Sequence, residues 1–320
     1  MSDRWRVLAL PPLPKDVLEG LFGDERAEIV VPVERSQAAV DALLPDVDIV
    51  IGDWTHDLRV NDPGARLSLV QMPSVGVDTI DVDRCTAAGI PVANSAGANS
   101  VSVAEWCISA TFALLRKTIE ADAAVRRGEW PQTSVGGREL AGSTIGIVGM
   151  GGIGRAVAGM FSAFDCQVRY WSRSRHPEAP ASYLELDELM ATSDVIVLVI
   201  ALSQETRGLI DSRRLGLVKA GALLVNGGRG GLLDETALIE ALRRGALAGA
   251  ALDVFAVEPL PSDSPLRALP VVLSPHMAGS TGQAAMRIVG QTAANLRRVF
   301  DGEPVIDVVN GIDAAVRRRS

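Results

Sequence analysis

Cysteine is scarce in this chain of 320 residues, and its scarcity excludes two kinds of structural support. The three cysteines, Cys85, Cys107 and Cys166, lie far apart and form no C-x-x-C pair. This spacing matches neither a disulfide framework nor a cysteine-ligated zinc site. We therefore expect no bound metal and interpret the three thiols as small apolar side chains of the core.

Long apolar runs and an excess of positive charge are also lacking. The longest apolar run, residues 195–202, is far shorter than the roughly 20 residues that span a bilayer. The apolar run near the start is too short for a signal peptide. With 31 Lys and Arg against 39 Asp and Glu, the net charge of −8 gives no electrostatic reason to bind nucleic acid or an anionic membrane. We expect a cytoplasmic protein whose partner is a small molecule.

Short β-branched segments alternate with helix-length amphipathic segments along nearly the whole chain. This alternation is typical of parallel α/β units with right-handed crossovers. The expected strands form two series, 6–10, 28–31, 48–51, 67–71 and 91–93, and then 144–148, 168–171, 195–200, 222–225, 248–251 and 271–273. The predicted fold is therefore α/β, with two doubly wound parallel-sheet domains of the Rossmann or flavodoxin type.

Two helical segments set the expected domain boundaries. Residues 101–127 carry apolar residues at helical spacing up to Gly128, which predicts one long linking helix. Residues 283–300 follow the last strand of the second series, so we expect this helix and the tail to pack on the first domain. The predicted domains are 1–98 with 284–320, which would bind the substrate, and 99–283, which would bind a dinucleotide.

A glycine-rich turn follows the first expected strand of the second series. Gly149, Gly151 and Gly154 complete the pattern G-x-G-x-x-G before a helical segment, and Gly152 and Ile153 lie inside the pattern. The first glycine permits the tight turn, the second lets the backbone approach a pyrophosphate, and the third lets helix and strand pack closely. The N–H groups at the helix start attract phosphates. Because strand, turn and helix occur in this order, we interpret the segment as a dinucleotide-binding turn and not as a merely structural loop.

The residues after the next strand indicate which dinucleotide binds. An acidic residue normally stands there to bind the adenosine ribose, but this chain has Ser172, Arg173, Ser174 and Arg175. Guanidinium and hydroxyl groups bind a 2′-phosphate through charge-assisted hydrogen bonds, whereas a carboxylate repels it. We expect NADP(H), with NAD(H) possible. The alternative is that both arginines are solvated loop charges.

An arginine, a carboxylate and a histidine downstream of this turn are the side-chain types needed to reduce a carbonyl. Arg229 lies between glycines, Glu258 precedes a proline and His276 follows an expected strand. A guanidinium stays charged and presents a fixed fork of donors to a carboxylate or 2-oxo acid. An imidazole exchanges protons near neutral pH. The plainer alternatives are a loop charge, a turn carboxylate and a structural histidine; His56 and His176 are expected at the surface or at a pocket rim.

Seven segments in a fixed order carry a resemblance to a known family. They are SVGVDTID at 74–81, NSAGANSVSVAEW at 94–106, GMGGIG at 149–154, ETRGLI at 205–210, KAGALLVNGGRGGLLDETAL at 219–238, ALDVFAVEPL at 251–260 and LSPHMAGST at 273–281. With them the chain resembles the D-isomer-specific 2-hydroxyacid dehydrogenases, which include glyoxylate/hydroxypyruvate reductases and phosphoglycerate dehydrogenases. The resemblance covers nearly the whole chain and implies an oxidoreductase acting on small 2-oxo or D-2-hydroxy acids.

The resemblance also implies a role for each candidate catalytic and substrate-binding residue. Arg229 would pair with the substrate carboxylate and polarise the reacting carbonyl, while His276 would donate or accept the proton. Glu258 would orient the imidazole and favour its protonated form. The backbone N–H groups of Val75 and Gly76 would hold the substrate carboxylate, because peptide N–H groups can bind an anion.

Two further expectations follow from the resemblance. Asp253 would lie near the nicotinamide or support the Glu258–His276 pair. In similar proteins the arm after the linking helix, here residues 128–138, crosses to a partner, and the apolar surface of this region is more than one domain needs. We therefore expect a homodimer.

The substrate stays open within this class. The leading interpretation is an NADPH-dependent reductase of the glyoxylate/hydroxypyruvate type; the alternatives are an NAD-dependent D-2-hydroxyacid dehydrogenase of the phosphoglycerate type and a dinucleotide-sensing, corepressor-like binding protein. Residues 52–55 read Gly-Asp-Trp-Thr where phosphoglycerate-oxidising relatives commonly carry a basic residue, and an acid beside an indole disfavours a phosphate. Formate dehydrogenases usually carry glutamine at the position of Glu258, which disfavours that activity.

Overall fold

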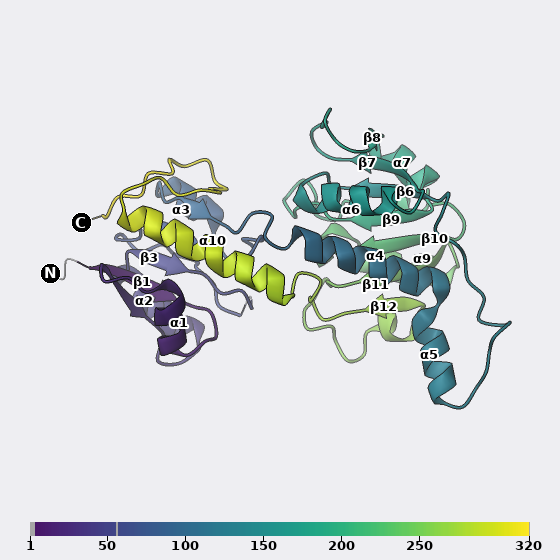
Figure 1. Cartoon of the computed structure of the whole chain (residues 1–320), viewed down its shortest axis with the longest axis horizontal. Helices are drawn as coiled ribbons and strands as arrows, with labels where there is room; N and C mark the ends of the chain where they lie inside the picture. The colour runs from purple at the N-terminus through teal and green to yellow at the C-terminus, as the bar shows by residue number, and fades with distance from the viewer. Residues whose placement is uncertain (1–3, 56, 320) are drawn as a thin grey trace. The chain divides into compact units, whose positions relative to one another are not determined.

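A computed structural model describes residues 4–55 and 57–319 (Figure 1), so His56 lies outside the described residues. The chain forms two compact units, one from Met1–Asn99 with Gly282–Ser320 and one from Ser100–Thr281. Each unit is built on one parallel sheet. The predicted α/β class with two doubly wound parallel sheets is confirmed.

The first unit contains a five-stranded sheet in the order β2-β1-β3-β4-β5. Its elements are β1 (Trp5–Ala9), α1 (Lys15–Phe22), β2 (Ala27–Val30), α2 (Gln37–Leu43), η1 (Leu44–Asp46), β3 (Ile49–Ile51), β4 (Leu69–Gln71), α3 (Val82–Ala87), β5 (Val92–Ala93) and α10 (Gly282–Phe300). Leu296 and Val299 of α10 are buried in one core with α1 and β1, and the tail residues Val305 and Val316 join them. The C-terminal segment therefore completes the first unit, as predicted.

The second unit contains a seven-stranded sheet in the order β12-β11-β10-β9-β6-β7-β8. Its elements are α4 (Ser100–Arg116), α5 (Thr118–Arg126), β6 (Thr144–Val148), α6 (Gly152–Ser162), β7 (Gln167–Trp171), β8 (Ser182–Tyr183), α7 (Leu186–Thr192), β9 (Val195–Leu198), α8 (Ser212–Leu215), β10 (Ala222–Asn226), η2 (Gly230–Leu232), α9 (Glu235–Arg243), β11 (Leu247–Leu252), η3 (Pro265–Ala268) and β12 (Val271–Leu273). Strand order reverses at β6, which has β9 on one side and β7 on the other. In doubly wound sheets, ligands bind outside the carboxyl ends of the strands at such a reversal.

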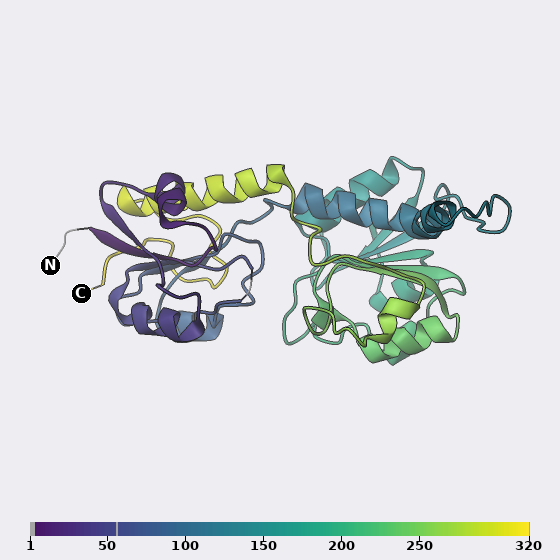
Figure 2. The same cartoon turned by 90° about the horizontal axis from the view of Figure 1, so that it is seen from below.

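Helices cover both faces of the second sheet (Figure 2). One core packs α4 and α6 against the sheet, and the other packs α7, α8 and α9 against the opposite face. Every residue of β9 and β10 is buried. Strands buried on both faces need apolar residues at every position, which explains why these segments appear as continuous apolar runs in the sequence.

The prediction of one helix over 101–127 was wrong. The chain leaves α4 at Arg116 and enters α5 at Thr118, and Lys117 between them adopts a left-handed backbone with φ 48°. Lysine carries no sequence signal for this conformation, which favours glycine and asparagine. The two-residue edge strand β8 was also missed, because so short a strand has no detectable periodicity.

The described part of the chain has no helix that is both long and apolar enough to cross a membrane. Within 4–55 and 57–319 there is also no group of three or more His, Cys, Asp or Glu side chains able to hold a metal ion. Cys85 and Cys107 are buried, and Cys166 is half-buried. Burial raises the pKa of the Cys85 thiol to about 11, so this sulfur stays protonated and acts as an apolar side chain.

Candidate active site

The candidate residues of the second unit follow the carboxyl ends of its strands. The glycine turn follows β6, residues 172–175 follow β7, Arg229 follows β10, Asp253 follows β11 and His276 follows β12. Because these strands are parallel and belong to one sheet, the five segments share one edge of it. Glu258 lies in the connection between β11 and β12.

The glycine turn after β6 leaves room where a phosphate group would have to approach. A Cβ added to Gly154 would lie 2.0 Å from the carbonyl oxygen of Gly149, so this glycine lets α6 pack against the turn. A Cβ on Gly151 would meet no atom within 4 Å, so the space beside it is open. Gly151 caps α6 without a side-chain hydrogen bond, which leaves the N–H groups of the first helical turn for a ligand. These features fit a dinucleotide pyrophosphate.

Ser172 was expected to bind the 2′-phosphate, but its side chain is buried in the loop after β7. It is 7% exposed, and its hydroxyl donates a hydrogen bond to the carbonyl oxygen of Ser174. The hydroxyl of Tyr170 accepts a hydrogen bond from the His176 N–H at 2.8 Å and donates to the His176 carbonyl at 3.1 Å. The loop after β7 is therefore held at both ends, with Ser172 serving the loop itself.

Both arginines of this loop have carboxylate partners. Arg173 Nη1 lies 3.4 Å from Glu205 Oε2, and Arg175 Nη2 lies 3.3 Å from Glu185 Oε1. The Arg175 guanidinium also lies over the Tyr183 ring, 4.3 Å from its centroid. All four charged side chains are more than half exposed. Exposed pairs of this kind are weak, so an anion of higher charge can compete for the guanidinium groups.

Arg229 stands on a tight turn that Asn226 closes. Asn226 is fully buried; its Oδ1 accepts a hydrogen bond from the Gly228 N–H, and its Nδ2 donates to the Arg229 carbonyl, both at 3.1 Å. A Cβ on Gly230 would lie 1.8 Å from the carbonyl oxygen of Phe255. The turn is thus fixed against the segment that follows β11. Sequence reasoning missed Asn226, although asparagine favours such turns.

Asp253 anchors the loop that carries His276. It is 2% exposed, and its carboxylate accepts hydrogen bonds from the Ser274 hydroxyl at 2.6 Å, the Met277 N–H at 2.8 Å and the Ala278 N–H at 2.7 Å. The His276 N–H donates to the Asp253 carbonyl at 2.8 Å. These bonds surround His276, whose backbone has φ 52° in the left-handed region. A histidine is uncommon there and is kept in place by the surrounding contacts.

Glu258 and His276 form a direct pair. Oε2 of Glu258 lies 2.8 Å from Nδ1 of His276, while Oε1 accepts a hydrogen bond from the Phe255 N–H at 2.9 Å. Partial burial opposes ionisation of Glu258, but the hydrogen bonds from His276 and Phe255 and the charge of Arg229 outweigh it and lower the pKa of the carboxyl. The carboxylate is therefore ionised at neutral pH.

The first unit carries the loop predicted to bind a carboxylate, residues 74–78 after β4. Val75 and Gly76 are both partly exposed.

Near the end of β3, Asp53 is 1% exposed and its Oδ2 lies 2.7 Å from Arg35 Nη2. Asp53, the acid expected to disfavour a phosphate, is thus buried, and its charge is paired with that of Arg35. The sequence could not reveal this, because Arg35 is 18 positions away.

Comparison with known proteins identifies the relatives of this chain. Residues 108–278 match the family described as "D-isomer specific 2-hydroxyacid dehydrogenase, NAD binding domain". A glyoxylate reductase of Aeropyrum pernix is 41% identical over 265 residues, which cover 79% of this chain and 79% of that protein. A D-3-phosphoglycerate dehydrogenase of Mycobacterium leprae is 38% identical over 86% of this chain, and the match spans only 53% of that longer protein.

A solved structure shares both the fold and nearly the full length. It is an acyclic imino acid reductase in complex with NADPH and D-Arg, 26% identical, with a TM-score of 0.85 over 95% of this chain and 99% of that one. The fold and the family match together make a nicotinamide dinucleotide the cofactor class of this chain.

Proposed function

Because this chain belongs to the D-isomer-specific 2-hydroxyacid dehydrogenase family, we propose that it is an oxidoreductase that transfers a hydride between NADP(H) and a small 2-oxo or D-2-hydroxy acid. The observation that carries the proposal is the Glu258–His276 pair, 2.8 Å apart, at the sheet edge where Arg229 and the glycine turn also stand. A proton donor and a fixed cation beside a dinucleotide turn suit reduction of a carbonyl.

Each residue of the site has a role in this reaction. The guanidinium of Arg229 pairs with the substrate carboxylate and polarises the carbonyl, because its charge persists at any working pH. Glu258 holds Nδ1 of His276, so Nε2 is the nitrogen that exchanges a proton with the substrate oxygen. Asp253 positions the loop that carries His276 through its hydrogen bonds and takes no part in the proton transfer. The nicotinamide, when bound, supplies the hydride.

We propose NADPH as the preferred dinucleotide and glyoxylate or hydroxypyruvate as the substrate type. Arg173 supports the first, because it stands after β7 where a ribose-binding acid is otherwise expected. Its contact with Glu205 opposes the preference but is exposed and weak. The test is a panel of 2-oxo acids, each assayed with NADH and with NADPH by the absorbance of the reduced nicotinamide.

The panel also separates the alternatives. We expect turnover of a small 2-oxo acid at the usual ~1–10³ s⁻¹. Activity with NADH alone would indicate an NAD-dependent dehydrogenase, and oxidation of a phosphorylated hydroxy acid would indicate the phosphoglycerate type. Tight dinucleotide binding without turnover of any member would favour a corepressor-like sensor.

Replacing Glu258 with glutamine is expected to lower kcat of reduction without abolishing it. Proton transfer from the imidazole requires the ring to be oriented toward the substrate oxygen. The glutamine keeps the size of the side chain but loses the charge-assisted hydrogen bond to Nδ1, so kcat should fall by about tenfold while the Kd for NADPH stays unchanged. Glu235→Gln is the matched control, because Glu235 accepts a hydrogen bond from Ala256 in the same region at 3.1 Å. An unchanged kcat in Glu258→Gln would remove this role.

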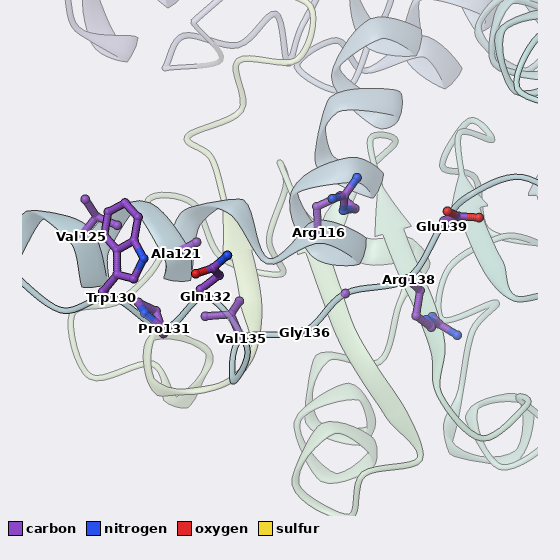
Figure 3. A pocket seen from close by; sticks show the side chains of 11 residues that line it. Arg116, Ala121, Val125, Trp130, Pro131, Gln132, Val135, Gly136, Arg138 and Glu139 are labelled. Carbon is purple, nitrogen blue, oxygen red and sulfur yellow. The ribbon is translucent and has the colours of Figure 1, made fainter.

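We propose that the chain forms a homodimer through α5 and the arm that follows it. Trp130 is 79% exposed and Val125 50% exposed, and Figure 3 shows the two side by side. They line a hollow of about 600 Å³ with Ala121, Pro131 and Val135. Exposed large apolar side chains grouped around a hollow are typical of an interaction surface.

Light scattering should therefore give a mass near twice the 33.7 kDa of the chain. Trp130→Asp should shift the protein toward the monomer, because a charge in a buried interface is unfavourable. The control is Val33→Asp, since Val33 is fully exposed in the first unit. A single species of 33.7 kDa for the unmodified protein at micromolar concentration excludes the dimer.

A further inference from the structure

Three consecutive carbonyl groups in the loop after β4 all accept hydrogen bonds. The Ser74 carbonyl accepts from the Ser95 N–H at 2.9 Å, and the Val75 carbonyl accepts from Nδ2 of Asn94 at 2.7 Å. The Gly76 carbonyl accepts from the Ser74 hydroxyl at 2.6 Å. The first two donors come from adjacent residues directly after β5. The segment after β5 therefore holds the 74–78 loop by donating to the carbonyl oxygens of Ser74 and Val75.

The geometry of the peptide bond also fixes the direction of the N–H groups on the opposite side of the loop. In a trans peptide the C=O of one residue and the N–H of the next point in opposite directions. Since the carbonyls of Ser74 and Val75 point toward the segment after β5, the N–H groups of Val75 and Gly76 point away from it. In the part of the chain that the structure describes, neither N–H donates to a protein acceptor, and both residues are partly exposed.

Asn94 suits this position for reasons of charge and length. It is 8% exposed, and its own N–H donates to the Asp307 carbonyl at 3.2 Å, so its backbone is fixed. Its Oδ1 is buried and has no hydrogen-bond partner among the described residues. A buried acceptor without a partner is unfavourable by itself. The position therefore requires the Nδ2 donor of the amide. An aspartate would place a negative charge against the Val75 carbonyl, and a serine would not reach it.

We propose that Asn94 is a positioning residue for the substrate carboxylate: by holding the Val75 carbonyl it aims the Gly76 N–H, beside that of Val75, at the anion. Two aligned N–H groups bind a carboxylate better than groups that must first be ordered. The inference rests on the proposed function, because it assumes that a 2-oxo acid places its carboxylate at this loop. It adds a residue that contacts no substrate and acts through the backbone.

The test compares Asn94→Ser with Asn310→Ser. Asn310 also tethers β5, since its Oδ1 accepts from the Val92 N–H at 3.1 Å and its Nδ2 donates to the Ile90 carbonyl at 2.9 Å, but it makes no contact with the 74–78 loop. We expect Asn94→Ser to raise KM for the best 2-oxo acid of the panel about tenfold, the loss of roughly one hydrogen bond, while kcat changes little. Asn94→Asp should raise it further, and Asn310→Ser should leave it unchanged.

A binding measurement makes the result independent of turnover. Oxamate, an unreactive analogue of a 2-oxo acid, should bind the NADPH complex of Asn94→Ser about tenfold more weakly, as the lost hydrogen bond requires, while the affinity for NADPH stays unchanged. If Asn94→Ser does not fold, Asn94→Asp provides the second variant, because it keeps the shape of the side chain, removes the donor to the Val75 carbonyl and should also raise KM.

The outcomes separate this inference from the proposed function. If the unmodified protein reduces a 2-oxo acid and a folded Asn94→Ser keeps its KM and its oxamate affinity, the positioning role is wrong and the function stands. If the unmodified protein neither reduces a 2-oxo acid nor binds oxamate, both are wrong.

Discussion

Replacing His276 should reduce kcat for 2-oxo acid reduction by roughly 10²–10⁴, the usual contribution of a positioned proton donor. Asparagine is the better replacement than alanine, because His276 has φ 52° and asparagine tolerates this left-handed conformation. His276→Asn therefore removes the imidazole and keeps the loop that Asp253 holds. Steady-state kinetics with saturating NADPH gives the measurement.

Replacing Arg229 should have a comparably large effect. Arg229→Ala is expected to abolish measurable reduction, because the substrate loses both its carboxylate partner and the polarising charge. Arg229→Lys tests geometry against charge, since a lysine retains the charge but not the fork of donors. Neither residue belongs to the glycine turn, so the Kd for NADPH should stay within about twofold in every variant, a change of well under one hydrogen bond. A near-normal kcat in either folded variant contradicts the role of that residue.

The second large effect concerns the choice of dinucleotide. The substitution Arg173→Ala is expected to weaken NADPH binding tenfold to a hundredfold, on the order of one or two charge-assisted hydrogen bonds to the 2′-phosphate. NADH binding should change little, because NADH has no 2′-phosphate for the guanidinium to bind. Fluorescence titration of both reduced dinucleotides against the unmodified and substituted proteins measures the change directly.

Two controls sharpen this experiment. Arg213→Ala removes an arginine as exposed as Arg173, 54% against 53%, from a pair with Asp187. It should leave both affinities unchanged. Glu205→Gln frees Arg173 from its partner and should strengthen NADPH binding severalfold at most, as expected for an exposed pair. Equal affinities for NADH and NADPH in the unmodified protein would reduce Arg173 and Arg175 to solvated loop charges.

Sequence patterns predicted the framework well wherever local chemistry dictates structure. The ranges 144–148 and 271–273 coincide with β6 and β12, because glycine or proline residues stand close outside both strands and mark their limits. The return of α10 to the first unit also followed from the order of strands alone. Features without a local signal were missed: the left-handed Lys117 that divides α4 from α5, and the two-residue strand β8.

For the candidate site, the sequence predicted which residues would follow the strand ends but not which side chains would contact them. The Glu258–His276 pair was expected, and the two side chains are in contact at 2.8 Å. The partners of Arg173 and Arg175 were not expected, because Glu205 and Glu185 lie 32 and 10 positions away. Pairings between loops depend on tertiary placement, which no spacing in the sequence encodes. For the same reason the tether from Asn94 to Val75 is visible only in the structure.

The fate of the hydride is the most direct test of the proposed activity. NADPH deuterated at C4 of the nicotinamide is incubated with the unmodified protein and the best 2-oxo acid of the panel, and the product is analysed by mass spectrometry. We predict a D-2-hydroxy acid that carries deuterium at C2, and no deuterium at that carbon when unlabelled NADPH is used in heavy water. A 2-hydroxy acid that takes its C2 hydrogen from solvent, or the absence of product with every 2-oxo acid and both dinucleotides, would contradict the account.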